Sequence, residues 1–139
     1  MRTSPIVAAA AVLAATLAAP AAGSDGSLVH TLRQGVAQIR RPQTQQRLDA
    51  ALAQTLARLR ADTASTAAGR RGRRLAIRGF TWTRKGIQAQ LDMRANDSGN
   101  VEAATRDAKR ADRCLGRGAA VLRAAGRAFG LRIGSLNGH

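Results

Sequence analysis

The sequence predicts an all-α protein, a small antiparallel bundle of three to four helices. Apolar residues recur at helical spacing over most of the chain beyond residue 27, and Ala, Arg and Leu, all good helix formers, are abundant. No stretch has the pattern of an all-β module. With two Phe, one Trp and no Tyr in 139 residues, the core has to be built from Leu, Ile, Val and Ala.

The first 22 residues have the three regions of a secretory signal peptide. Arg2 precedes an apolar run over residues 6–19, and small residues follow around Pro20. An uncleaved anchor is the alternative, but this Ala-rich run barely reaches the roughly 18–20 strongly apolar residues that span a bilayer. We therefore expect cleavage of residues 1–22 and export of a single helical domain, residues 23–139, with no transmembrane segment.

Two helices are expected at 28–40 and 43–61. Val29, Leu32, Val36 and Ile39 form one apolar stripe, and Leu48, Leu52, Leu56 and Leu59 form a second stripe in a different phase. The phase changes at Pro42, which removes a backbone donor and disfavours helix at the preceding residue. The pattern therefore favours two helices, or one sharply kinked helix, over a straight rod.

Residues 62–74 are predicted to form a linker. The stretch begins with small residues, ends in the basic run Arg70-Arg71-Gly72-Arg73-Arg74, and has no periodic apolar face. The basic run is either a solvated hinge or an anion-contacting segment.

A long fourth helix is expected at 100–129. Large or apolar residues recur every seven positions with small residues between them, and Gly130 is suited to the left-handed conformation that ends a helix. The heptad positions are Val101, Ala108, Leu115, Leu122 and Phe129, with Ala104, Ala111, Gly118 and Ala125 between them.

Residues 73–96 are predicted to form the third helix and to pair with the fourth as a helical hairpin. Gly72, Gly79 and Gly86 recur every seven residues, and close helix packing explains glycines that otherwise weaken a helix. A β-hairpin over 75–93 is the alternative, although two strands alone are marginal in water. The helical interpretation pairs small residues mostly with small and large with large: Gly72–Ala125, Gly79–Gly118, Gly86–Ala111, Met93–Ala104, Leu75–Leu122, Trp82–Leu115 and Ala89–Ala108.

This pairing places Trp82 in the core. A second apolar face of the same helix, formed by Phe80, Ile87 and Leu91, is expected to be covered by helices 28–40 and 43–61.

The chain carries 23 Lys and Arg against 8 Asp and Glu, a net charge of +15. The fourth helix is especially basic, and its charges are either a solvated outer face or a stripe that binds a polyanion by releasing counterions. The candidate anion-contacting residues are Arg70, Arg71, Arg73, Arg74, Arg106, Lys109, Arg110, Arg113, Arg117 and Arg127.

No catalytic or metal-binding motif is present. Two His and one Cys cannot form a ligand cluster, and neither His lies at a spacing that a hydrolytic motif requires. Cys114 is expected to be a small apolar residue at a helix boundary, or a thiol that links two chains after export. We therefore expect no enzyme activity, no cofactor and no small-molecule substrate.

The function that this pattern favours is contact with anionic polymers or surfaces of the cell envelope or extracellular space, after export to the periplasm, the envelope or the medium. The alternative is a protein-interaction or assembly module, including a homodimer, in which the charge serves solubility.

Overall fold

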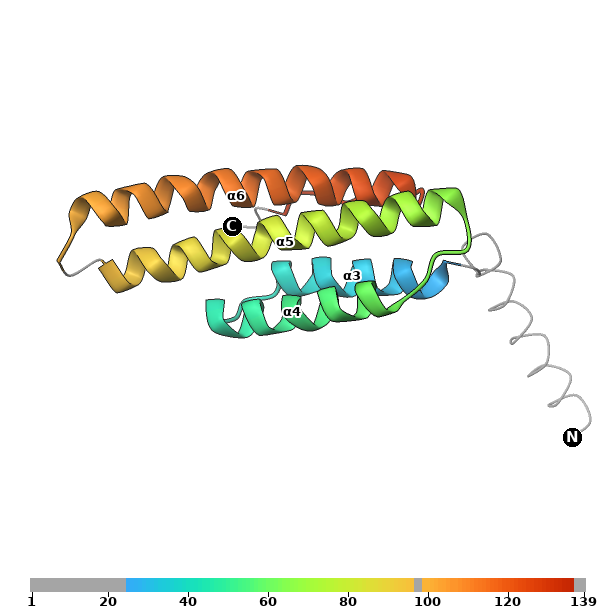
Figure 1. The fold of residues 1–139 in the computed structure, drawn as a ribbon, viewed down its shortest axis with the longest axis horizontal. Helices are drawn as coiled ribbons and strands as arrows, with labels where there is room; N and C mark the ends of the chain where they lie inside the picture. The colour runs from blue at the N-terminus through green and yellow to red at the C-terminus, as the bar shows by residue number, and fades with distance from the viewer. Residues whose placement is uncertain (1–24, 97–98, 137–139) are drawn as a thin grey trace, which may run out of the picture.

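The computed structural model describes residues 25–96 and 99–136, and all regular secondary structure in them is helical (Figure 1). The predicted all-α bundle is therefore confirmed, and the β-hairpin alternative for 75–93 is wrong. The proposed signal peptide, residues 1–22, lies outside the described residues. The four helices are α3 (Gly26–Arg40), α4 (Gln45–Ala61), α5 (Ala67–Asn96) and α6 (Val101–Ala128).

The break between α3 and α4 lies where Pro42 predicts it. Arg41 is extended, with ψ at 134°, as the residue before a proline prefers. Thr44 then caps α4, since its hydroxyl accepts a hydrogen bond from the Arg47 backbone N–H at 3.2 Å. The first two apolar stripes therefore lie on two separate helices.

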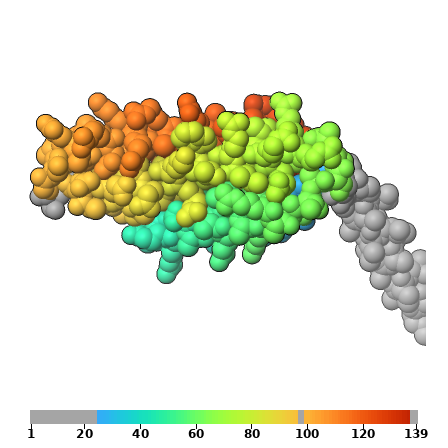
Figure 2. All heavy atoms as spheres, viewed as in Figure 1, coloured from blue at the N-terminus to red at the C-terminus, as the bar shows by residue number. Residues whose placement is uncertain are grey.

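α5 and α6 form a long antiparallel hairpin, and the shorter helices α3 and α4 lie along only part of it (Figure 1). The first residue of α4 marks the edge of this cover, because Gln45 Nε2 donates to Gln90 Oε1 at 2.6 Å. Figure 2 shows the remainder of the hairpin projecting past α4. We call residues 67–91 and 113–128 the hairpin root, and residues 92–96 and 99–112 the hairpin tip.

The core lies between α3, α4 and the hairpin root. Phe80 is fully buried and Ile87 is nearly so, whereas Leu91, near the edge of the cover, is half-buried. Gly35 on α3 makes room for Phe80, because a methyl group at Gly35 would collide with the Phe80 ring. The predicted second apolar face of α5 is thus confirmed. Its fully buried partners on the shorter helices are Leu28, Leu32, Leu52 and Leu59.

The contact between α5 and α6 differs from the predicted pairing. A methyl group added at Gly79 would lie 2.6 Å from Leu122 Cγ, and one added at Gly86 would lie 2.6 Å from Leu115 Cγ. Each large side chain therefore packs on a glycine, because the missing Cβ provides the space that the side chain fills. Gly118 does lie against Gly79, with 3.0 Å from an added methyl group to the Gly79 carbonyl oxygen.

The register is shifted by about one helical turn from the predicted one. Gly72 meets Phe129 rather than Ala125, in the same pattern as the other two glycines. Pairing large with large residues would hold the helices apart, whereas large on glycine allows both close approach and a filled interface. The sequence identified the glycine positions correctly but, apart from the Gly79–Gly118 contact, it did not predict the large residues that pack on them.

The predicted linker at 62–74 is too long, because α5 begins at Ala67 and includes the whole basic run. Its first turn is held by Thr66, whose hydroxyl accepts from the Gly69 N–H at 2.9 Å. Asp25 lies beside this turn and accepts hydrogen bonds from the Ser65 N–H, at 2.8 Å, and from the Thr66 hydroxyl. This capping explains why Arg70 and its neighbours are helical.

The chain after α6 turns back over the bundle. Gly130 has φ of 74°, and the Leu131 N–H donates to the Gly126 carbonyl at 2.7 Å, which together make a Schellman ending. The segment then packs Ile133 near Gly126 and buries Leu136. The left-handed Gly130 was predicted, but the returning tail was not.

Candidate functional site

The structure divides the ten predicted anion-contacting residues between the two parts of the hairpin. Seven lie in the root and three in the tip, so the expected continuous stripe along α6 does not have one uniform environment. The root residues are Arg70, Arg71, Arg73, Arg74, Arg113, Arg117 and Arg127, and the tip residues are Arg106, Lys109 and Arg110.

One of the root residues has a structural partner. Arg73 Nε donates to the Leu59 carbonyl at 2.7 Å, and its terminal nitrogen donates to the Arg60 carbonyl at 3.0 Å. These carbonyls lie in the last turn of α4, which has no further helical donors. Arg73 therefore ties α4 to α5 and is half-buried, unlike its exposed neighbours in the basic run.

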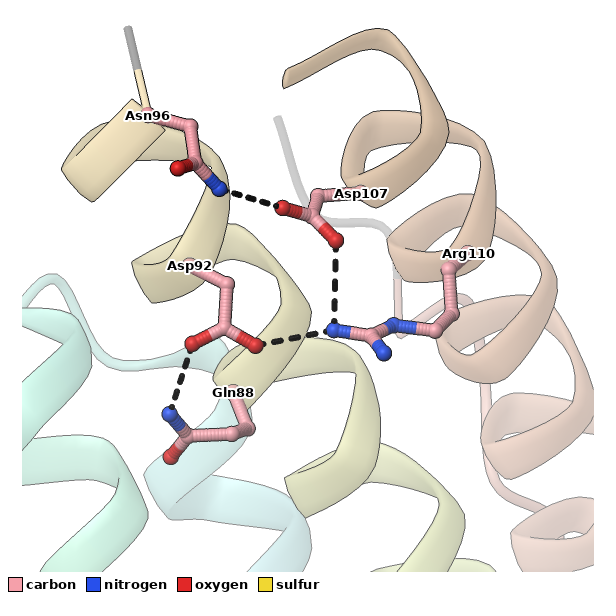
Figure 3. Close-up of polar contacts among 5 residues, drawn as sticks. All are labelled: Gln88, Asp92, Asn96, Asp107 and Arg110. Atoms are coloured by element: carbon pink, nitrogen blue, oxygen red, sulfur yellow. Dashed lines mark hydrogen bonds and ion pairs between the residues drawn. The ribbon is translucent and has the colours of Figure 1, made fainter. Parts of the chain in front are cut away.

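In the tip, Arg110 is held between two acidic residues. Its guanidinium lies 2.8 Å from an Asp92 carboxylate oxygen and 3.3 Å from Asp107 (Figure 3). Gln88 donates to Asp92 at 3.2 Å and Asn96 donates to Asp107 at 3.0 Å, so the two helices are joined by a polar network. Arg110 is thus already paired, which weakens its assignment as an anion-contacting residue.

Charge is distributed unequally along the hairpin. The described tip residues include four acids (Asp92, Glu102, Asp107 and Asp112) and four bases (Arg94, Arg106, Lys109 and Arg110). The root sequence contains no Asp or Glu. It holds seven bases on α5 (Arg70, Arg71, Arg73, Arg74, Arg78, Arg84 and Lys85) and four on α6 (Arg113, Arg117, Arg123 and Arg127).

One root cation is neutralised from outside the hairpin. Arg84 makes two hydrogen bonds to the Asp49 carboxylate of α4, at 2.9 and 3.1 Å. This hydrogen-bonded pairing raises the pKa of Arg84 above its ordinary value, although partial burial opposes the rise. Arg84 therefore fastens α4 to α5, whereas Arg71, Arg74 and Arg78 are exposed.

The prediction that Trp82 packs in the core against Leu115 is wrong. Trp82 is half-buried, with Lys85 Nζ 4.8 Å and Arg117 Cζ 4.7 Å from its ring centroid. The shifted register explains the difference, because it places Leu115 on Gly86 and leaves Trp82 beside the seam. Both cations are within the range of a cation–π contact.

Trp82 lines a groove between α5 and α6, with a volume of about 910 Å³. Every lining residue belongs to these two helices, so α3 and α4 leave this side of the hairpin open. Cys114, which is 8% exposed, contributes to the groove together with Ala120 and Arg113. The volume falls within the range of about 300–1,000 Å³ that is usual for ligand sites.

Three residues of the root surface, Arg78, Trp82 and Lys85, were not among the predicted site residues. Arg71, Arg74, Arg78, Trp82 and Lys85 are three or four positions apart, a spacing that gathers them on one side of a helix. Four of the five already lay within the predicted helix at 73–96, and only Arg71 required an earlier helix start.

Within the described residues, no three His, Cys, Asp or Glu side chains come together as a possible metal site. None of the helices described here is long and apolar enough to cross a membrane. No protein-family model matches the chain, and comparisons with curated proteins and with solved structures find no significant match.

Proposed function

We propose that the chain is an exported, non-enzymatic protein that binds anionic polymers or surfaces through the root of its α5–α6 hairpin. One observation carries the proposal: the root contains eleven basic residues and no acidic one, with Asp112 adjoining its boundary on α6, whereas the described tip residues are balanced at four and four. A charge excess meant only for solubility has no need of this segregation.

The physical basis of binding is counterion release. A polymer of phosphates or sulfates carries a layer of condensed cations, and each contact with Arg or Lys frees one of them. The helical backbone of α5 holds Arg71, Arg74 and Arg78 in fixed order on its exposed surface. Such a row presents several cations at once without the ordering cost of a flexible tract.

A pair of matched triple variants tests the location of the site. R71Q/R74Q/R78Q removes three exposed root charges, and R94Q/R106Q/K109Q removes three exposed tip charges, so both have the same net charge. A 20-base-pair DNA duplex serves as a defined phosphate polymer, with binding measured by anisotropy over a series of salt concentrations. We expect the slope of log K against log salt to decrease by about 3 in the root variant, at about 0.9 per lost contact.

The tip variant is the control, and its slope is expected to stay near that of the parent protein. Equal losses in both variants would mean that binding follows net charge and has no site. Failure of the parent protein to bind the duplex or heparin even at about 0.05 M salt would contradict polymer binding itself, because many phosphate contacts give tight binding at low salt with a steep salt dependence.

The alternative function, a protein-interaction or assembly module, is favoured by one feature of the tip. Val101 is 78% exposed, and in the described residues it is the one large apolar side chain left in solvent. A second chain or partner that covers the tip would bury it. Sedimentation equilibrium over a range of protein concentrations distinguishes the two functions, because an assembly through the tip gives a mass that rises with concentration and is relieved by Val101→Lys.

A further inference from the structure

The groove beside Trp82 combines two features that the proposed polymer site does not require. It is lined by Trp82, Cys114 and Ala120 together with four cations, Lys85, Arg110, Arg113 and Arg117. Two acids, Asp92 and Asp112, also line it, and Asp92 is paired with Arg110. Two of the other cations, Lys85 and Arg117, lie over the ring of Trp82, the one Trp of the chain.

The cations around Trp82 differ from the other positioned cations of the hairpin. Arg84 and Arg110 are held by carboxylates, which neutralise them and accept their N–H groups. Lys85 and Arg117 are instead placed over an aromatic ring, at 4.8 and 4.7 Å from its centroid. A ring attracts a cation through its quadrupole and leaves the charge and the outward N–H donors available to an anion.

The remaining lining is suited to an apolar group. Gly116 and Ala120 have little or no side chain, so the groove stays open between the larger residues that flank it. Burying a chain of methylene groups there is favourable because it removes apolar surface from water. A polymer of phosphates and sugars has no such segment, whereas an amphiphile has both an anionic head and an apolar chain.

We infer that this groove binds a single anionic amphiphile, with a phosphate head between Lys85, Arg113 and Arg117 and an apolar chain over Trp82, Cys114 and Ala120. This ligand class goes beyond the proposed polymer binding and does not depend on it. The proposed occupant is a monomeric phosphate ester, because a groove of about 910 Å³ has room for one such molecule.

Three probes distinguish the contribution of the charged head from that of the apolar chain. They are dodecyl phosphate below its micelle concentration, inorganic phosphate, and uncharged dodecyl maltoside. Binding is measured by calorimetry and by the emission of Trp82, the one Trp in the sequence. We expect dodecyl phosphate to bind about ten-fold or more tightly than either control, since each control lacks one of the two interactions. Its binding is also expected to shift the Trp82 emission maximum.

The charge contribution is tested by K85Q/R117Q against the tip variant R106Q/K109Q, which removes one Lys and one Arg from exposed positions as well. The groove variant is expected to weaken dodecyl phosphate binding by about ten-fold, and the tip variant by less than about two-fold. Circular dichroism confirms that both variants keep the helical content of the parent protein.

Several outcomes would overturn the inference. Equal binding of inorganic phosphate would reduce the site to an anion clamp, and equal binding of dodecyl maltoside would reduce it to an apolar groove. Binding to phosphatidylglycerol vesicles with none to monomeric dodecyl phosphate would place the interaction on a membrane surface. Duplex binding is recorded on the same samples, so that loss of the amphiphile site and loss of polymer binding are seen separately.

Discussion

In the root of the hairpin, Leu115 and Leu122 of α6 pack on glycines of α5, and helices α3 and α4 cover the outside. In the tip, the two helices stand without that cover and are joined by the network of Asp92, Arg110 and Asp107 (Figure 3). The same two helices therefore pair by apolar interdigitation in one half and by polar contacts in the other.

This difference in packing explains why the root can carry more unpaired charge than the tip. The root obtains its stability from buried apolar contacts, so its surface can carry basic residues without acidic partners on the same helices. The tip has little apolar cover, and its cations are balanced by nearby acids. Basic charge without acidic partners on the same helices therefore occurs where the hairpin is held by apolar packing.

The largest difference is expected between two truncations on α6. Leu122→Ala removes a fully buried side chain that sits on Gly79, and it should lower the free energy of unfolding by about 2–5 kcal/mol. Val101→Ala removes a side chain that is 78% exposed, and it should change the value by less than about 0.5 kcal/mol. Urea titration measures both, and similar losses would show that the tip also has a buried seam.

The same substitution should have opposite signs at two glycines of the hairpin. Gly79→Ala puts a methyl group 2.6 Å from Leu122 Cγ and 3.0 Å from the Leu122 backbone nitrogen, so we expect a net loss of about 1–2 kcal/mol. Gly116→Ala meets no atom within 4 Å, so the gain in helix propensity should stabilise the protein by about 0.5–1 kcal/mol. Thermal melts distinguish them, and a stabilising Gly79→Ala would contradict the close approach.

A smaller effect is expected from the polar network of the tip. The Asp92 and Arg110 side chains are 42% and 49% exposed, so their coupling should be about 0.2–1 kcal/mol and should decrease with added salt. A double-mutant cycle with Asp92→Asn and Arg110→Gln measures it. A coupling of several kcal/mol that is insensitive to salt would show that the tip is as tightly held as the root.

The smallest expected effect concerns the loss of stability at low pH. Hydrogen bonds from Thr66 and Ser65 hold the pKa of Asp25 below its ordinary value, and the charge of Arg70 adds to this. A lowered pKa stabilises the fold above a pH of about 4, and this contribution is lost as the pH falls through the folded-state pKa. Asp25→Asn should therefore destabilise the protein at neutral pH and weaken the acid dependence, as measured by melting between pH 2 and 7.

In that experiment Asp112→Asn is the control, because Asp112 is exposed on α6 and lies outside the α5 cap. If the melting temperature of Asp25→Asn falls at low pH as much as that of the parent protein, the cap contributes no pH dependence.

Local pattern was sufficient for the helices themselves. The break at Pro42 and the left-handed Gly130 both depend on a few adjacent residues, and each is found in the structure. The start of α5 was mislocated although its cap, Thr66, is local; the side chain that holds this cap in place is Asp25, 41 positions before Thr66 in the chain. Nothing local to residues 62–74 signals that partner.

The candidate site depended on information that periodicity does not contain. Heptad spacing predicts which residues of α5 and α6 meet, but a shift of one turn preserves the spacing and changes most of the partners. That shift placed Leu115 on Gly86 and left Trp82 between Lys85 and Arg117. The groove, and the distinction between paired and exposed arginines, follow from the register.

By itself the sequence determined an all-α bundle, its helix breaks, its glycine positions and its large positive charge, because these rest on composition and on contacts within a few residues. Only the tertiary structure decided which large residue fills each glycine position, how far α3 and α4 cover the hairpin, and where the tail returns. Those features depend on the volumes and partners of residues far apart in the chain, which pack in only one register.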